Sequence, residues 1–429
     1  MHRMQSSHTV LQPNTFKMQM LIWANQFNIC ALLDNHHYAS PYSTIDCILA
    51  VDTLSDCLPL SNKLNSLSTF IADTNDWVFG HLSYDLKEEI AGIKSNHPDY
   101  IAFPDLYFFQ PAIILELTGN QVSIASATIH PTEIFSAIQK MNIPEQNGNT
   151  LFIQPRISKE DYLQKIKTLQ QHILLGDCYE VNFCQEYFSE QANINPVQIY
   201  LQLTKLSPNP FACFYKYHSK YLLCASPERY LQKKNNRLIS QPIKGTVKRD
   251  LANATNDNHL KEQLRESVKD RAENVMVVDL VRNDLSKVCL SGSIKVDELF
   301  GIYSFPQVHQ MISTISGVPN PNKDFCEILK ASFPMGSMTG APKHRVMQLI
   351  EELEETKRGL YSGAVGYIDP SKDFDFNVVI RSIQYNEANQ YLSYQVGGGI
   401  TFYSDPEKEY EECLAKAAAI LQVLHQQSG

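Results

Sequence analysis

The chain has 429 residues, of which 43% are hydrophobic and 19% charged, and its formal net charge is −9. This length suffices for two ordinary domains or for one large interwoven domain with a substantial core. Phosphate backbones and anionic lipid surfaces repel an acidic protein, so the charge argues against a nucleic-acid or membrane partner. An anionic substrate would therefore need a local cluster of positive charge.

The N-terminal part contains one short apolar run at residues 20–24, and no segment approaches the length of a membrane span. The sequence therefore predicts neither a signal peptide nor a transmembrane helix. Ten cysteines are scattered along the chain without a CxxC pair or a metal-ligand spacing. We expect reduced, mostly buried thiols in a cytoplasmic protein.

The clearest break in composition is the polar segment 141–150, whose Pro and Gly residues indicate a linker or a long loop. Before it, apolar strand-like pieces such as "WVFGHLSYDL" carry few convergent polar groups. After it, "CYEVNFCQEYF" alternates like a strand, with Glu180 and Asn182 on one face. A second predicted strand ends in "CASPERY", which places Glu228 at a strand terminus, where catalytic groups often lie.

The stretch "SQPIKGTVKRD", residues 240–250, places Lys244 between Pro242 and Gly245 in what otherwise resembles a strand. Pro242 removes a backbone donor and Gly245 removes a side chain, so the backbone suits a sheet edge or the close approach of a ligand. Taken alone, Lys244 is better explained as a solvated strand lysine, and only its neighbours favour a functional role.

Two predicted helices each carry an acidic pair three residues apart. Asp270 and Glu273 form the first pair; Glu409 and Glu412 form the second, with Lys416 one turn further. Carboxylates from two helices could hold Mg²⁺ together with water, or they could be solvated helix faces. The first helix is expected to continue through residues 260–280, with an apolar stripe comprising Leu260, Leu264, Val268 and Val275.

The glycine-rich segment "GSMTGAPK" leads into an amphipathic helix, with Pro342 expected at its first position. Such a helix start favours an anion, for which a carboxylate would serve as well as a phosphate, although an ordinary helix cap explains it too. Arg381, on a predicted strand, suits a bidentate contact with a carboxylate or a structural ion pair.

Taken in order, "GDCYEVNFCQEY", "SPERY", "PIKGT", "RAENVMVVDLVRNDL", "HQMISTISG", "GSMTGAPK", "GLYSGAVGY", "IRSI", "VGGGI" and "DPEKEYEECLAK" resemble the chorismate-binding enzyme family. The resemblance is dense over residues 158–420 and weak before them. It implies an α/β (α+β) fold like that of anthranilate synthase component I, a large sandwich of two mainly antiparallel sheets with helices outside. Residues 1–150 would form an N-terminal subdomain of the same sandwich, and residues 151–426 the catalytic region.

Within this family, "PIKGT" resembles the aminodeoxychorismate synthase component I branch, whereas anthranilate synthases usually carry "PIAGT". The resemblance implies that Lys244 attacks C2 of chorismate as a nucleophile, which requires a deprotonated amine and hence a lowered pKa. Glu228 matches the family's general acid and base. The product would be 4-amino-4-deoxychorismate, a precursor of 4-aminobenzoate and folate.

The resemblance assigns the remaining site residues by motif. Glu273 and Glu412 match direct ligands of a Mg²⁺ cofactor, and Asp270 and Glu409 match partners that act through water. The predicted substrate-binding residues are Arg381, Tyr361, Gly397, Gly398, Gly399, Lys343, Thr339, Gly340 and Lys416, while His309 and Thr246 complete the predicted catalytic set.

Two residues depart from the family pattern. Isochorismate and salicylate synthases carry a lysine at position 180 to activate water, and the ammonia-using members more often carry glutamine. Glu180 therefore argues against a water-adding enzyme and leaves the local hydrogen bonding open. Asn274 replaces the more usual histidine.

The resemblance implies that ammonia comes from a separate glutamine amidotransferase subunit. Two alternatives stay open from the sequence. One is anthranilate synthase component I, for which alanine would be expected at position 244. The other is a non-catalytic subunit that only binds an amidotransferase, which would not need Lys244, Glu228 and both acidic pairs.

Overall fold

The computed structural model describes residues 3–38, 41–42, 45–143 and 151–425. Most of the predicted linker 141–150, with the boundary expected at residue 150, lies outside the described residues. No helix within the described ranges is long and apolar enough to cross a membrane.

The strands pair antiparallel throughout the described part of the chain and build two layers that meet at the long strand β5 (Leu106–Thr118). The beginning of β5 pairs with β4 and its end with β6, so the sheet divides at this strand.

The first layer follows the order β1 (Met4–Thr9), β6 (Gln121–Ser126), β5, β3 (Cys47–Cys57), β2 (Ile29–Asp34), β9 (Phe211–Tyr217), β10 (Lys220–Ser226), β19 (Ser382–Asn386), β20 (Tyr391–Ile400) and β8 (Glu180–Ser189), and the short strands β7 (Gln154–Pro155) and β16 (Gly340–Ala341) also pair with β8. The second layer continues from β5 through β4 (Val78–Leu82), β17 (Ala364–Ile368), β18 (Phe374–Asn377), β11 (Arg229–Lys234), β12 (Arg237–Gln241) and β15 (Val308–Gly317), which also pairs with β13 (Ile243–Lys248) and β14 (Lys295–Ser304).

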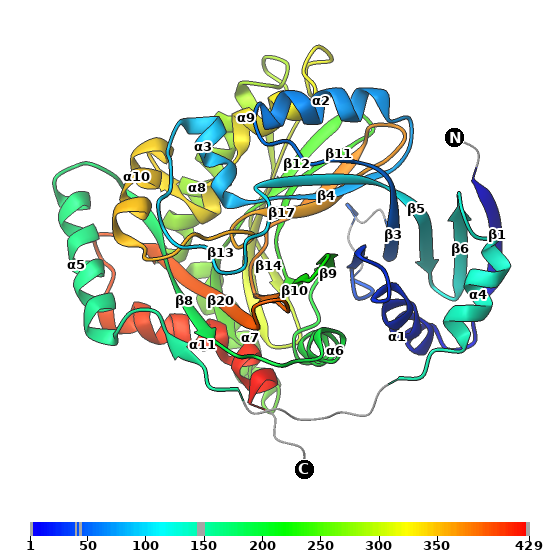
Figure 1. Cartoon of the computed structure of the whole chain (residues 1–429). Helices are drawn as coiled ribbons and strands as arrows, with labels where there is room; N and C mark the ends of the chain where they lie inside the picture. The colour runs from blue at the N-terminus through cyan, green and yellow to red at the C-terminus, as the bar shows by residue number, and fades with distance from the viewer. Residues whose placement is uncertain (1–2, 39–40, 43–44, 144–150, 426–429) are drawn as a thin grey trace.

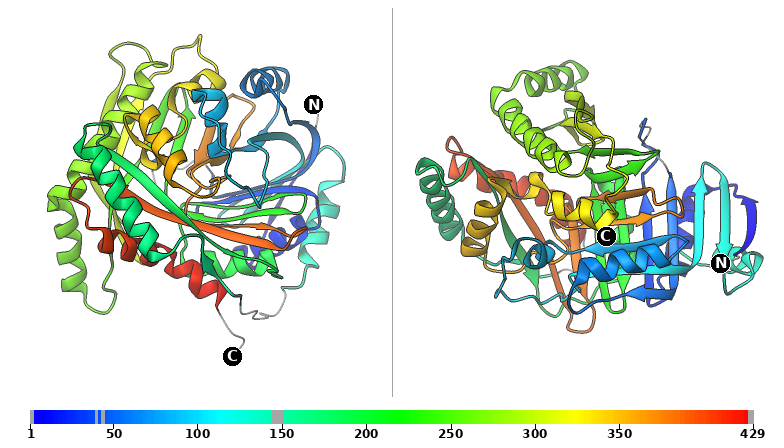
Figure 2. Two further views of the ribbon diagram at one scale, coloured as in Figure 1. Left: turned by 60° about the vertical axis from the view of Figure 1, so that its left-hand side comes forward. Right: turned by 90° about the horizontal axis from the view of Figure 1, so that it is seen from above.

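Helices cover the outer faces of both layers (Figures 1 and 2). The helices that share an apolar cluster with the first layer are α1 (Pro13–Ala24), α4 (Pro131–Gln139), α5 (Lys159–Leu174), α6 (Pro196–Leu206), α10 (Lys343–Leu353) and α11 (Pro406–Leu424). The helices that share a cluster with the second layer are α2 (Lys63–Asp73), α8 (Val268–Ser286) and α9 (Phe325–Ser332). The remaining helical segments are α3 (Lys87–Ala91), α7 (Ala254–Glu266) and the 3₁₀ turns Tyr84–Leu86 and Gly336–Met338.

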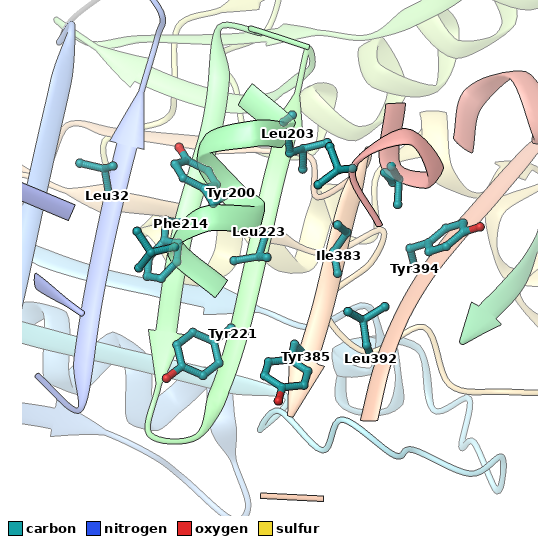
Figure 3. Close-up of a cluster of buried hydrophobic side chains, with 14 of the residues drawn as sticks. Leu32, Tyr200, Leu203, Phe214, Tyr221, Leu223, Ile383, Tyr385, Leu392 and Tyr394 are labelled. Carbon is teal, nitrogen blue, oxygen red and sulfur yellow. The ribbon is translucent and has the colours of Figure 1, made fainter. Parts of the chain in front are cut away.

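Figure 3 shows part of the cluster outside the first layer, where Tyr200 and Leu203 of α6 lie over Phe214 and Leu223 of β9 and β10. The rings of Tyr200 and Phe214 meet edge to face with centroids 5.5 Å apart. A third cluster joins side chains of β3, β5 and β9 to side chains of β4 and β17, so it lies between the two layers. The predicted sandwich with outer helices is therefore confirmed.

The expected continuous helix through residues 260–280 is wrong, because the chain breaks at Ser267 into α7 and α8. The Ser267 hydroxyl accepts the Asp270 N–H and so caps a new helix, which changes the phase of the apolar stripe. As a result Val268 and Val275 are exposed, and Val277 and Val278 are buried instead. The ten cysteines are buried free thiols, as the sequence predicted.

Candidate active site

A cavity opens where β13 and β20 meet the helices α8 and α11. The predicted site residues that line it are Lys244, Glu228, Thr246, Arg381, Tyr361, Gly397, Gly399, Lys416, Asp270, Glu273 and Glu412. These residues come from segments that are up to about 190 positions apart in the sequence, so only the tertiary fold brings them together.

Lys244 lies on β13, where the pairing with β15 shifts between Ile243 and Thr246. Gly245 has a φ of +92°, a conformation that favours glycine, and the resulting bulge directs Lys244 into the cavity. The side chain is buried rather than solvated, and its Nζ lies 2.5 Å from Oε1 of Glu180.

The lowered pKa that we expected for Lys244 is wrong for the ligand-free protein. Burial lowers the pKa of the Lys244 ammonium, but the carboxylates of Glu180, Glu273 and Glu228 outweigh it and raise the pKa well above its ordinary value. The ammonium form is therefore favoured, and a proton must leave Nζ before this nitrogen can attack a substrate.

Glu228 follows β10, and its carboxyl is buried beside the cavity. The Ser337 hydroxyl donates to Oε1 of Glu228 at 2.6 Å, and the Glu228 N–H donates to Ser226. Burial raises the pKa of Glu228 to about 7, against the lowering effects of Ser337 and Lys244. Near neutral pH the carboxyl can therefore both give and take a proton, as a general acid and base must.

The acidic pairs of α8 and α11 approach each other across the mouth of the cavity. The Lys269 ammonium lies 3.8 Å from Glu273 and 3.5 Å from Glu409, so it bridges the two helices. Burial raises the pKa of Glu273 to about 7, and its Oε1 is buried without a hydrogen-bond partner among the described residues. Glu412 contacts Lys416 at 2.7 Å.

These carboxylates do not form a group of three or more metal-ligating side chains within the described ranges. Their chemistry nevertheless fits Mg²⁺, which prefers one or two carboxylates completed by water and substrate oxygens. The observation that supports this fit is Oε1 of Glu273, which is buried without a hydrogen-bond partner among the described residues and is linked to Glu409 of the other acidic pair only through Lys269.

Two cationic side chains and a stretch of glycine backbone form the part of the lining next to Glu412. Arg381 donates from Nη1 to the carbonyl of Lys416 at 2.9 Å, and Lys416 donates from Nζ to the carbonyl of Gly397 at 2.7 Å. A Cβ on Gly397 would collide with the Phe183 carbonyl, so glycine is required there. Arg381 and Lys416 thus give an otherwise acidic protein the local positive charge that an anionic substrate needs.

Several predicted site residues lie behind this lining. His309 on β15 shares hydrogen bonds with Asp257 at 3.1 Å and Ser304 at 2.8 Å. Lys343 begins α10, but its ammonium contacts Asp284 at 2.6 Å rather than the cavity. We expected Pro342 to be the first residue of α10. It is instead the N-cap, and the helix begins at Lys343.

Thr339 and Gly340 are buried where the short strand β16 pairs with β8, and Gly340 lies opposite Val181. A Cβ on Gly398 would lie 3.0 Å from the carboxylate of Glu409, so Gly398 faces this side chain. Glu409 itself is buried. Asn274 is buried, and its Oδ1 accepts a hydrogen bond from Ser313 at 2.5 Å. These residues shape the wall rather than form its surface.

The sequence analysis missed Glu180, Ser337 and Lys269 as site residues. Glu180 was noted as a departure from a pattern, but nothing in the sequence shows that it reaches Lys244, because the two are 64 positions apart. Ser337 lies within the glycine-rich segment that was singled out, so that segment did indicate the right place. Lys269 directly precedes the first acidic pair, and its side chain could have been read as part of that pair.

Comparison with known proteins identifies the family. The family model described as "chorismate binding enzyme" matches residues 30–422. The chain belongs to the chorismate-binding enzyme family. Several of the motifs quoted from the sequence meet at the cavity lined by Lys244, Glu228, Glu273 and Glu412.

Two curated relatives carry related names. The chain is 33% identical over 348 residues to "Aminodeoxychorismate synthase component 1" of Escherichia coli, covering 80% of this chain and 76% of that protein. It is 39% identical over 280 residues to "Aminodeoxychorismate synthase, chloroplastic" of Arabidopsis thaliana, covering 65% of this chain. The chain spans only 30% of the length of this plant relative.

Among solved structures, anthranilate synthase component I from Streptococcus pneumoniae matches with a TM-score of 0.78 at 24% identity, covering 90% of this chain and 95% of that chain. At this identity the match establishes the fold alone. It agrees with the expected fold class.

Proposed function

We propose that the protein is component 1 of an aminodeoxychorismate synthase, which converts chorismate and ammonia into 4-amino-4-deoxychorismate and water. The observation that carries the proposal is Lys244, whose amine lies inside the cavity with the acid and base Glu228 on the same lining. The printed names of the bacterial and plant relatives support the same reaction.

In the proposed first step the lone pair of Lys244 Nζ forms a bond to C2 of chorismate and the C4–O bond breaks. Both conjugated ring double bonds shift, from C1=C2 and C5=C6 to C1=C6 and C4=C5. Glu228 gives its proton to the departing hydroxyl, which leaves as water. A carboxyl with a pKa of about 7 holds that proton over part of the neutral range. The result is a covalent adduct between Lys244 and the substrate.

In the proposed second step the lone pair of ammonia bonds to C4 and the bond between C2 and Lys244 breaks. The two ring double bonds shift back from C4=C5 and C1=C6 to C5=C6 and C1=C2. The new ammonium group returns a proton to the Glu228 carboxylate. Glu228 therefore ends the cycle as it began, and the atoms balance as chorismate plus ammonia giving product plus water.

The substrate is a dianion, and the cavity offers a place for each carboxylate. Arg381 suits bidentate binding of one of them, and the glycine backbone of β20 beside Lys416 suits the other. Glu273 and Glu412 would hold a Mg²⁺ ion, which neutralises carboxylate charge when bound. The acidic side chains around the cavity would otherwise repel such a substrate.

We further propose that ammonia reaches the site from a separate glutamine amidotransferase subunit. The term "component 1" in the name of the E. coli relative supports this, because it implies a second component. Free ammonium salt would replace that subunit in an assay at mildly alkaline pH.

The test is mass spectrometry of the products formed from chorismate, Mg²⁺ and ammonium. The proposal predicts a product that keeps the enolpyruvyl group and carries nitrogen at C4. Anthranilate with free pyruvate would instead identify an anthranilate synthase. Unchanged chorismate, both alone and with an added amidotransferase subunit, would favour the non-catalytic alternative.

A further inference from the structure

The strongest unexplained feature of the site is the contact between Lys244 and Glu180. Nζ of Lys244 lies 2.5 Å from Oε1 of Glu180, and both side chains are buried. Glu180 does not belong to the cavity lining among the described residues; it lies behind Lys244 at the start of β8. The contact between Lys244 and Glu180 therefore lies beside the cavity and not on its described lining.

The second oxygen of Glu180 has spare capacity as an acceptor. Oε2 is buried and has no hydrogen-bond partner in the described part of the chain. Gly399 of β20 makes room for the pair, because a Cβ there would collide with Glu180 and lie 2.9 Å from Nζ of Lys244. A buried carboxylate with a free oxygen beside a single amine is arranged to receive a proton.

Other charged groups face the Lys244–Glu180 pair from the surrounding elements, so Glu180 is not the only group that affects the protonation of Lys244. They are Glu228 after β10, Lys269, Asp270 and Glu273 of α8, Arg381 before β19, and Glu412 and Lys416 of α11. Of these, none lies within 4.0 Å of Nζ as an ion pair, which leaves Glu180 as the nearest base in the described residues.

We propose that Glu180 is a further catalytic residue of this protein, the base that takes the proton from Lys244 as Nζ attacks the substrate. The inference rests on the proposed function. The N–H bond of Lys244 breaks, its electron pair forms the bond to C2, and the proton moves to Glu180. When the amine leaves C2 in the second step, Glu180 returns that proton, so the pair is restored without exchange with water.

The geometry gives the reason for such a base. A substrate that fills the cavity separates Lys244 from bulk water, and water could otherwise accept the proton. Proton transfer within the pair leaves the total charge of the site unchanged, so no net charge is created in a buried region. The same transfer to solvent would leave Glu180 charged and unpaired.

The test is the rate of adduct formation at Lys244 in a single turnover without ammonia, measured as a function of pH. The wild-type rate should fall as pH rises above about 7, because Glu228 must hold the proton that it gives to the departing hydroxyl, so each variant is compared with the wild type at the same pH. Glu180→Gln keeps the shape of the side chain but cannot accept the proton. Relative to the wild type it should react about 10²-fold more slowly at pH 7, and this difference should shrink as pH rises, because the proton can then leave to solvent.

Glu186→Gln is the matched control, since Glu186 is another buried carboxylate of β8 whose partners are Arg156 and Tyr391. It should leave the pH profile unchanged. Glu180→Asp retains a carboxylate at a greater distance and should give an intermediate rate with the same pH profile as the wild type, which tests the base even if the glutamine variant folds poorly.

An unchanged rate and profile in Glu180→Gln would overturn the inference, and so would a faster reaction at pH 7, because Glu180 would then only hold Lys244 protonated. Either result would leave the proposed function intact if the wild type still aminated C4. A wild type that forms neither the adduct nor a C4-aminated product would overturn the proposed function and this inference together.

Discussion

The parts of the molecule before and after the segment 144–150 contribute differently to the fold and to the site. The earlier part supplies β1 to β6, and β2 and β4 pair directly with the later strands β9 and β17. Every residue in the described lining of the candidate active site, however, comes from position 182 onward. The first part therefore completes both sheets without placing a side chain on the cavity surface.

This difference separates two kinds of constraint on the sequence. In the first part, strand residues need only to be apolar and of the right size, as in the buried run of β3. In the second part, single positions must combine charge, burial and backbone conformation. Lys244 requires the bulge at Gly245, and Gly397 must lack a side chain. Substitutions in the two parts should accordingly fail in different ways.

The largest expected effect is the loss of chemistry in Lys244→Ala. The variant lacks the nucleophile, so we expect C4 amination to fall by at least about 10³-fold in protein that remains folded. Thermal stability should also fall, because Glu180 stays buried without its ammonium partner. Lys248→Ala, an exposed lysine on the same strand, is the control. Full amination by the Lys244 variant would remove the nucleophile from the mechanism.

The next effect concerns Glu228→Gln, which should slow amination by about 10²-fold because the departing hydroxyl loses its acid. Folding raises the pKa of Glu228 from 4.5 to about 7, so this carboxyl favours the folded state below pH 4.5 and loses that contribution as pH rises through 7. The glutamine variant should therefore gain thermal stability relative to the wild type at pH 8 but not at pH 4. Equal stability differences at both pH values would contradict the buried, neutral carboxyl.

A smaller effect is expected for Arg381→Lys, which keeps the charge but loses bidentate geometry. KM for chorismate should rise about tenfold with a smaller change in kcat, because the lost contact serves binding. Steady-state kinetics with ammonium salt would measure this. Arg237→Lys, a partly exposed arginine of β12, serves as the control. An unchanged KM would show that Arg381 does not bind the substrate.

The smallest effect on chemistry is expected in the first part of the chain. Leu49→Ala removes a fully buried side chain of β3 and should lower the free energy of unfolding by about 3 kcal/mol. Its kcat and KM at low temperature should stay within about twofold of the wild type. A large loss of kcat in protein that is still folded would show that the first part shapes the site after all.

The sequence predicted the fold class and about half of the described cavity lining, because motif order identifies a family whose architecture is shared. A local pattern also placed Glu228 correctly, since it follows the end of β10. The apolar stripe of α8 was wrong because periodicity alone does not locate a break. Ser267 restarts the helix, and that depends on tertiary packing as well as on the cap.

The charge state of Lys244 could not be predicted for a different reason. The resemblance implied a lowered pKa, and burial alone would lower it, but the opposing carboxylates come from β8, α8 and the end of β10. Their distances from Nζ depend on the packing of three separate elements. The contact with Glu180 in particular joins β8 to β13 and has no local sequence signal.

The most direct test of the account is the mass of the peptide that contains Lys244 after incubation with chorismate and Mg²⁺ in the absence of ammonia. The account predicts an increase equal to chorismate less one water, located on Lys244 and discharged as 4-amino-4-deoxychorismate when ammonium is added. An unmodified Lys244 in protein that still aminates C4 once ammonium is supplied would contradict covalent catalysis by this lysine.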